Sequence, residues 1–250
     1  MKLHEIWRYP VKSLSGERLD RAVLNPGIGL PHDRRWALAR PDGDATAGGA
    51  WASKAHFYVL VREHGLAELR CQFDQISGQF SLTGPNGLKA EGNLAAPEGR
   101  AAIEEAVASH LGLSAADKPA LVEADSLGYF DAQVGPVSIL NMNSLRALGT
   151  ALGQDLDPLR FRMNFLVEGL DAWAEMAWPE KRVRIGKAEL KVTQITGRCK
   201  ATHVNPSTGS ADIQMVRALK DNFGHTQLGV YAEVINGGPI QPGDAVEVLD

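Results

Sequence analysis

The sequence predicts a mainly β (α+β) protein with a few helices, built in two parts. Short apolar runs recur between Gly, Pro and Asn turns, a pattern typical of antiparallel barrels and sandwiches. The 250 residues include 26 Gly and 13 Pro, which supply many such turns. A change of period near residue 98 and a polar stretch at 113–120 predict a β-barrel-like N-terminal part, residues 1–118, and a second part, residues 119–250.

In the first part, apolar runs closed by turn residues predict strands, and one segment has a helical period. Ile103, Val107 and Leu111 are spaced four residues apart and Gly112 follows them, which predicts a helix over 98–111. The predicted strands are 2–9, 19–25, 36–38, 56–62, 67–73 and 79–82.

In the second part, strands again dominate. Asn143 precedes an apolar stripe that ends at Gly153, which predicts a capped helix, and apolar residues after Asp212 predict another. The predicted strands are 163–168, 182–185, 188–195, 228–235 and 245–249.

Composition excludes several classes of function. The 26 basic and 30 acidic residues give a net charge of −4, which argues against a protein that grips a nucleic-acid backbone. No run approaches the roughly 18–20 apolar residues of a membrane span, and charges interrupt the N-terminus. We therefore expect a cytoplasmic protein with no nucleic-acid or membrane partner. The two cysteines, Cys71 and Cys199, cannot build the usual four-ligand zinc or iron–sulfur site.

The most informative segment is Gln194-Ile195-Thr196-Gly197-Arg198-Cys199. A strand ends in a Gly turn and presents a cysteine directly after an arginine. A positive neighbour and loop amides favour the thiolate, which is a nucleophile and a soft metal ligand. The alternative is an inert cysteine at a strand end, and the residues alone leave both open. His203, four residues later, could form a Cys–His couple or be an ordinary loop histidine.

Three further segments carry groups suited to an anion. Lys12 and Ser13 follow Pro10 at a strand end, where an ammonium beside a hydroxyl suits phosphate. In His32-Asp33-Arg34, the arginine can grip phosphate or carboxylate, or simply pair with its neighbour. Arg162 and Asn164 are two residues apart at the start of a predicted strand, so period two places them on one face. Cys71 lies among strand residues and is expected to pack.

Ordered motifs along the chain resemble the MOSC family, which is named for the C-terminal domain of molybdenum-cofactor sulfurases. They are YPVKSL, DRRW, FRMN, GRC and the closing GVYAEVINGGPIQPGDAVEVL. Residues before about 121 resemble the family's N-terminal β-barrel domain, and those after it resemble the MOSC domain. Members with both parts include mitochondrial amidoxime-reducing components and bacterial reductases of N-hydroxylated bases.

The resemblance implies a molybdenum cofactor, a pterin dithiolene (molybdopterin) that carries a phosphate. Cys199 would ligate the metal and act as the catalytic residue. The residues that would contact the cofactor are Lys12, Ser13, Arg34, Arg162, Asn164 and Arg198. The chain has no cysteine cluster of an appended ferredoxin, so a separate ferredoxin- or flavoprotein-type donor is expected. No Schiff-base lysine signal supports pyridoxal phosphate, which is not expected.

Three functions follow from these residues. The first is a molybdenum-dependent oxidoreductase that reduces N-hydroxylated or similar small molecules. The second is a carrier that holds sulfur on Cys199 as a persulfide or passes on the cofactor. The third is a β-barrel binding module in which Cys199 is structural.

Overall fold

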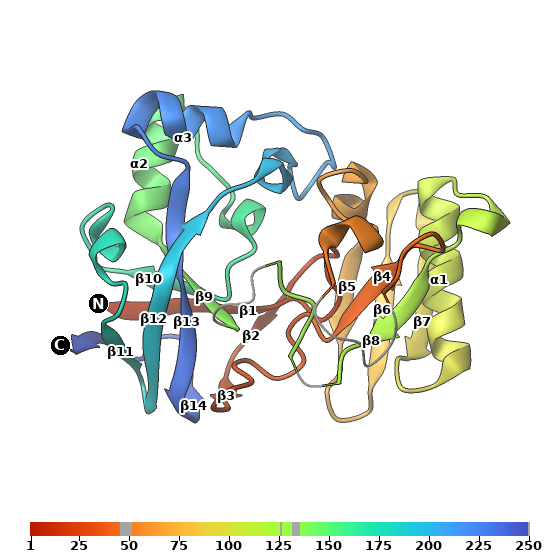
Figure 1. Cartoon of the computed structure of the whole chain (residues 1–250), viewed down its shortest axis with the longest axis horizontal. Coiled ribbons are helices and arrows are strands. Elements are labelled where there is room, and N and C mark those ends of the chain that lie inside the picture. The colour runs from red at the N-terminus through yellow and green to blue at the C-terminus, as the bar shows by residue number, and fades with distance from the viewer. Residues whose placement is uncertain (46–51, 126, 132–135, 250) are drawn as a thin grey trace.

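A curled eight-stranded sheet dominates the computed structural model, which describes residues 1–45, 52–125, 127–131 and 136–249 (Figure 1). Its strand order is β15-β11-β12-β13-β9-β10-β1-β2, and every neighbouring pair is antiparallel except β9 and β10. Its strands are β1 Lys2–Arg8, β2 Glu17–Leu19, β9 Val137–Asn141, β10 Phe165–Glu168, β11 Arg182–Ile185, β12 Ala188–Gly197, β13 Gln227–Asn236 and β15 Val246–Leu249. The prediction of a mainly β fold is confirmed.

Three small sheets complete the β structure. Two of them have two strands each, and the other has three strands in chain order. They are β4 Trp36–Ala39 with β8 Ala120–Glu123, then β5 Arg70–Phe73 with β6 Gln79–Thr83 and β7 Lys89–Asn93, and finally β3 Ala22–Leu24 with β14 Gly238–Ile240.

Three α-helices cover these sheets in the described part of the chain: α1 Pro97–Leu111, α2 Met142–Leu152 and α3 Met215–Phe223. α1 ends where Gly112 turns left-handed, as the sequence predicts. α2 buries Leu145 and Leu148 in a cluster that also holds Leu219 of α3. None of the helices in the described ranges is long and apolar enough to cross a membrane.

Strands from the two sequence parts pair with each other. β1 lies between β10 of the C-terminal part and β2 of the N-terminal part, so residues 2–8 join both parts in the large sheet (Figure 1). β8, which follows residue 118, pairs with β4 instead. The division of the chain at residue 118 stays a prediction. Because β1 ends at Arg8, the segment that follows it runs directly to the boundary between the large sheet and the smaller ones.

Several predicted elements were wrong in detail. The run 56–62 is not a strand: Phe57 forms one isolated bridge to Ala39, and the chain then turns at Arg62. Residues 57–60 are buried because they fill the space between two core clusters. The segment 19–25 is two strands that pair with different partners, and 67–73 begins as a 3₁₀ helix.

The second part also differs from expectation at element ends. α2 is capped by Asn141, whose side chain accepts from the N–H of Asn143, so the predicted cap lies inside the helix. α3 begins at Met215 rather than directly after Asp212. The strands β7, β8, β9 and β14 were not predicted from the sequence, which indicated a turn where β14 begins.

Candidate functional site

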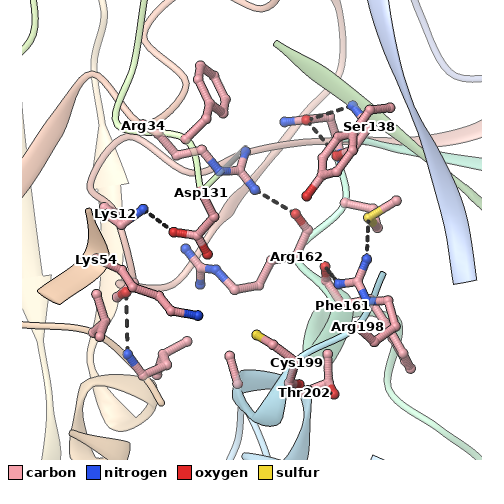
Figure 2. A pocket seen from close by; sticks show the side chains of 18 of the residues that line it. Lys12, Arg34, Lys54, Asp131, Ser138, Phe161, Arg162, Arg198, Cys199 and Thr202 are labelled. Carbon is pink, nitrogen blue, oxygen red and sulfur yellow. Dashed lines mark hydrogen bonds and ion pairs between the residues drawn. The ribbon is translucent and has the colours of Figure 1, made fainter. Parts of the chain in front are cut away.

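Cys199 lines a cavity of about 350 Å³ and lies two residues after the end of strand β12 (Figure 2). It precedes a 3₁₀ helix, η7 Lys200–His203, and its carbonyl accepts hydrogen bonds from the N–H and the hydroxyl of Thr202. The residue is partly exposed, so the thiol is not sealed in the core. This confirms the local prediction of a strand end that presents a cysteine.

Lys12 enters the same cavity from the segment after β1. Its N–H bonds to the carbonyl of Trp36 at 2.7 Å, and the residue is 7% exposed. The ammonium donates to the carbonyl of Tyr129 at 2.7 Å and to the carboxylate of Asp131. Burial lowers the pKa of Lys12, and Asp131 opposes that effect. Ser13 is also buried, in a left-handed conformation with φ 70°, and its hydroxyl accepts from the N–H of Leu60.

Arg34 and Arg162 face the cavity together, although 128 residues separate them. Both are left-handed, with φ 51° and 53°, and the Arg34 guanidinium donates to the carbonyl of Arg162 at 2.6 Å. Both guanidinium carbons lie over the ring of Tyr9, at 4.7 and 4.4 Å from its centroid. The two cations are therefore held side by side against one aromatic ring.

The charges of these two arginines are balanced differently. Burial opposes the charge of Arg34, but the adjacent carboxylate of Asp33 raises its pKa overall. Burial lowers the pKa of Arg162 to about 10; Tyr9 opposes this effect, and the charge of the nearby Arg34 adds to it by a smaller amount. The Arg162 guanidinium donates to the carbonyl of Leu14 at 2.6 Å, which is a neutral acceptor. Arg162 is thus a cation with incomplete compensation.

Arg198 lines the cavity beside Cys199 but also braces the fold. Its guanidinium donates to the carbonyl of Phe161 at 2.6 Å and lies near the sulfur of Met163. Burial lowers its pKa. Its Nε is buried and, among the described residues, has no hydrogen-bond partner.

Asn164 lines the cavity wall, and its amide is engaged in the core. Its oxygen accepts from Ser138, and its nitrogen donates to the carbonyl of Trp7 at 3.1 Å and to Asp33 at 3.0 Å. The prediction that Arg162 and Asn164 share one strand face was wrong. Arg162 ends a 3₁₀ turn in the left-handed region before β10 begins, so the period of a strand does not apply to it.

Some residues of the cavity were missed by sequence reasoning. Lys54 and Asp131, both labelled in Figure 2, line the cavity, as do Arg160 and Tyr231. Arg160 holds both carboxylate oxygens of Asp212, at 2.7 and 2.8 Å. No local motif marks these positions. An ion pair such as Lys12–Asp131 joins residues that are distant in sequence, and one sequence carries no signal for it.

The other candidates lie outside this cavity. His32 stacks on Trp36 with centroids 6.0 Å apart, and burial lowers its pKa. His203 accepts from the N–H of Val216 at 3.5 Å, so its ring nitrogen serves α3 rather than Cys199. Cys71 is packed as expected, and burial raises its pKa to about 12. Within the described ranges, no group of three His, Cys, Asp or Glu residues could hold a metal ion.

Together, the predicted residues form one site. Lys12, Ser13 and Arg34 come from one part of the sequence, and Arg162 and Cys199 from the other. Several cations and one accessible thiol meet in a cavity of ligand size. Such a site can bind an anion and, through the thiolate, a soft metal ion.

Two protein-family models match this chain. A model of the MOSC N-terminal beta barrel domain matches residues 1–127, and a model of the MOSC domain matches residues 129–247. The chain belongs to the MOSC family, with the N-terminal barrel domain that accompanies it.

Named relatives are similar in sequence. Mitochondrial amidoxime reducing component 2 from Bos taurus is 26% identical over 97% of this chain and 81% of its own length. Mitochondrial amidoxime-reducing component 1 from Homo sapiens is 31% identical over 50% of this chain and 40% of its own. Molybdenum cofactor sulfurase from Caenorhabditis briggsae is 31% identical over 45% of this chain and 16% of its own. The chain spans about two fifths of the length of the component 1 relatives from Xenopus laevis, Homo sapiens and Mus musculus.

Among solved structures, the YuaD protein from Bacillus subtilis superimposes with a TM-score of 0.48 at 14% identity, over 99% of this chain and 94% of its own. YiiM from Escherichia coli superimposes with a TM-score of 0.36 at 20% identity, over 48% of this chain and 57% of its own.

Proposed function

We propose that this chain binds a molybdenum cofactor in the cavity and reduces N-hydroxylated or related N-oxygenated small molecules, with electrons from a separate donor protein. The observation that carries the proposal is the convergence of Cys199 with buried cations from both parts of the chain. The substrate class comes from the relatives named amidoxime-reducing components, and the metal from the relative named molybdenum cofactor sulfurase. A cytoplasmic location stays a prediction.

The residues of the cavity fit such a cofactor. The pKa of Arg162 is lowered to about 10 because its charge is buried without a carboxylate of its own, and a bound phosphate would relieve that cost. The buried Nε of Arg198 is a further donor without an acceptor in the described residues. The thiol of Cys199 supplies a soft ligand that becomes a thiolate on losing its proton.

Each residue then has a defined task. Lys12, Arg34 and Arg162 would bind the phosphate and pterin, and Ser13 would donate its hydroxyl to the same anion. Cys199 would hold the metal as a thiolate, with Arg198 beside it as a fixed positive charge. When bound, the cofactor supplies two-electron removal of oxygen, which converts R–NHOH, two electrons and two protons to R–NH₂ and water.

A carrier role is the second candidate. Cys199 is the accessible one of the chain's two thiols, and Cys71 is buried. An accessible thiolate could hold a sulfur atom as a persulfide. Mass spectrometry of the intact protein would then show a sulfur adduct that disappears in Cys199→Ala, with no turnover of an amidoxime.

The deciding experiment compares three proteins made in a host that synthesises the molybdenum cofactor. Wild type and Cys71→Ala should contain molybdenum and reduce benzamidoxime with a chemical electron donor, whereas Cys199→Ala should lose both properties and keep its fold. Folded wild type without molybdenum would refute the proposal. Equal molybdenum in wild type and Cys199→Ala would remove the cysteine from the metal site.

A further inference from the structure

Four exposed basic residues belong to the segments that form the cavity and the adjoining pocket. The two pockets share Leu60, Arg160, Arg162 and Ala201 in their walls. We call the four exposed basic residues the basic rim: Lys54, Arg62, Arg70 and Lys200.

Contacts tie the members of the basic rim to neighbouring segments on each side. Lys54 lines the cavity together with Cys199, and Arg62 donates to the carbonyl of Ala55, the residue after Lys54. On the other side, Arg70 donates to the carbonyl of Pro206 at 2.7 Å, which ties β5 to the segment after η7.

Residues from the two sides of the basic rim also lie close to one histidine, His203. Besides burial, the charges of Lys200 and His64 lower the pKa of His203, so both side chains lie close to that imidazole. His64 starts η2 His64–Glu68 in the first part of the chain, and Lys200 starts η7 in the second. The basic rim therefore crosses the boundary between the two parts.

The rim residues lack carboxylate partners. In the described part of the chain, none of the four has a carboxylate oxygen within 4.0 Å, the limit for an ion pair. Exposed arginines and lysines elsewhere do pair, as Arg146 does with Glu168 and Lys191 with Glu180. The acidic side chains near the rim already have partners: Glu63 contacts Arg40, Glu68 contacts His110 and Asp131 contacts Lys12.

This local charge is opposite to that of the whole chain. The chain has a net charge of −4, whereas the four exposed cations of the basic rim have no carboxylate partner in the described residues. Such an asymmetry orients an approaching partner and raises its rate of association. The net negative charge at the same time opposes binding of long polyanions such as nucleic acid.

We propose that the basic rim is the docking surface for an acidic face of the separate electron-donor protein, which would bring its redox centre to the opening beside Cys199. This inference rests on the proposed function for the identity of the partner. With a one-electron donor, two donor molecules are oxidised for each N–O bond that is reduced, and solvent supplies two protons. No bond forms between donor and rim, so each oxidised donor can leave.

The test measures binding of oxidised plant-type ferredoxin, an acidic one-electron carrier, by calorimetry at low and high salt. The rim variant is Lys54→Glu/Lys200→Glu. The matched control, Lys181→Glu/Lys187→Glu, makes the same charge change at exposed positions beside β11 and β12. We expect the Kd at low salt to rise about tenfold or more in the rim variant and to stay within about twofold in the control. High salt should weaken wild-type binding by a similar factor.

Each other outcome counts against the proposal. Equal weakening of ferredoxin binding in both variants would show a general charge effect. Absence of ferredoxin binding by wild type at low salt would refute docking of an acidic partner. Binding of duplex DNA as tight as that of ferredoxin would mark the rim as a general polyanion site. Because the measurement needs no molybdenum, ferredoxin binding by a protein that fails to retain molybdenum would separate this inference from the proposed function.

A second measurement tests the electrostatic potential around Cys199 in the absence of any partner protein. The dianionic disulfide 5,5′-dithiobis(2-nitrobenzoate) should react with Cys199 several times more slowly in the rim variant than in wild type. The neutral 4,4′-dithiodipyridine should react at similar rates with both. If both reagents slowed by the same factor, the variant would have changed access to Cys199 rather than the local charge. That result would contradict a positive electrostatic potential from the basic rim.

Discussion

Tyr9 offers the sharpest test of how the cavity holds its cations. Its ring lies 4.7 Å from the guanidinium carbon of Arg34 and 4.4 Å from that of Arg162, whereas its hydroxyl is buried with no hydrogen-bond partner in the described residues. Burial raises the pKa of Tyr9 to about 12, so the phenol is neutral at ordinary pH. The ring, rather than the hydroxyl, is expected to position the two arginines.

Two substitutions separate the ring from the hydroxyl. Tyr9→Phe keeps the ring and removes an unsatisfied buried group, so its free energy of unfolding should stay within about 1 kcal/mol of wild type or exceed it. Tyr9→Leu removes two desolvated cation–π contacts, each worth up to about 2 kcal/mol, and leaves a smaller side chain in the core. We expect it to lower the free energy of unfolding by about 2–4 kcal/mol.

The assay is calorimetric titration with sulfate, a divalent tetrahedral anion that stands for the phosphate of the cofactor. Without the ring, the Arg162 guanidinium keeps its hydrogen bond to the carbonyl of Leu14 but loses the aromatic surface that it shares with Arg34. A penalty of about 1.4 kcal/mol for ordering the Arg162 guanidinium again corresponds to tenfold weaker binding in Tyr9→Leu. Tyr9→Phe should bind within about twofold of wild type. If Tyr9→Phe lost as much affinity as Tyr9→Leu, the hydroxyl would be the active group and this reasoning would be wrong.

Three further outcomes follow from the same structure. In native protein a thiol reagent should modify Cys199 alone, and Cys71 should react only after unfolding because it is buried with its pKa raised to about 12; fast labelling of both would contradict this. Sulfate affinity should fall as the pH rises from 8 to 10.5, because burial lowers the pKa of Arg162 to about 10 and also lowers that of Lys12; a flat profile would contradict the binding of the anion by these two buried cations. Asp212→Asn should reduce the loss of unfolding free energy at acid pH. The reason is that the hydrogen bond from Arg160 holds the pKa of Asp212 below its ordinary 3.8 despite partial burial. Its stabilisation is present above about pH 4 and is lost as the pH falls through the lowered pKa, so urea unfolding at pH 7 and 3 should differ less in the variant than in wild type.

What could be predicted from the sequence was local in origin. The helix over 98–111 was found to within one residue because its period and its terminal Gly112 are local signals. Cys199 was placed correctly at a strand end for the same reason. Asp131 and Lys54 were missed because they reach the site through the tertiary fold. The run 56–62 was misread because buried apolar segments look alike whether or not they join a sheet.

Three residues of the cavity have the same unusual backbone conformation. Ser13, Arg34 and Arg162 are all left-handed without being glycine, with φ of 70°, 51° and 53°. Each such residue costs of order 1 kcal/mol or more, and the cost persists only where surrounding contacts fix it. Glycine would avoid the strain at each position. Three residues with a strained backbone that line one cavity therefore indicate that their side chains are needed there. Core contacts such as those of Asn164 supply the stability that holds these residues in place.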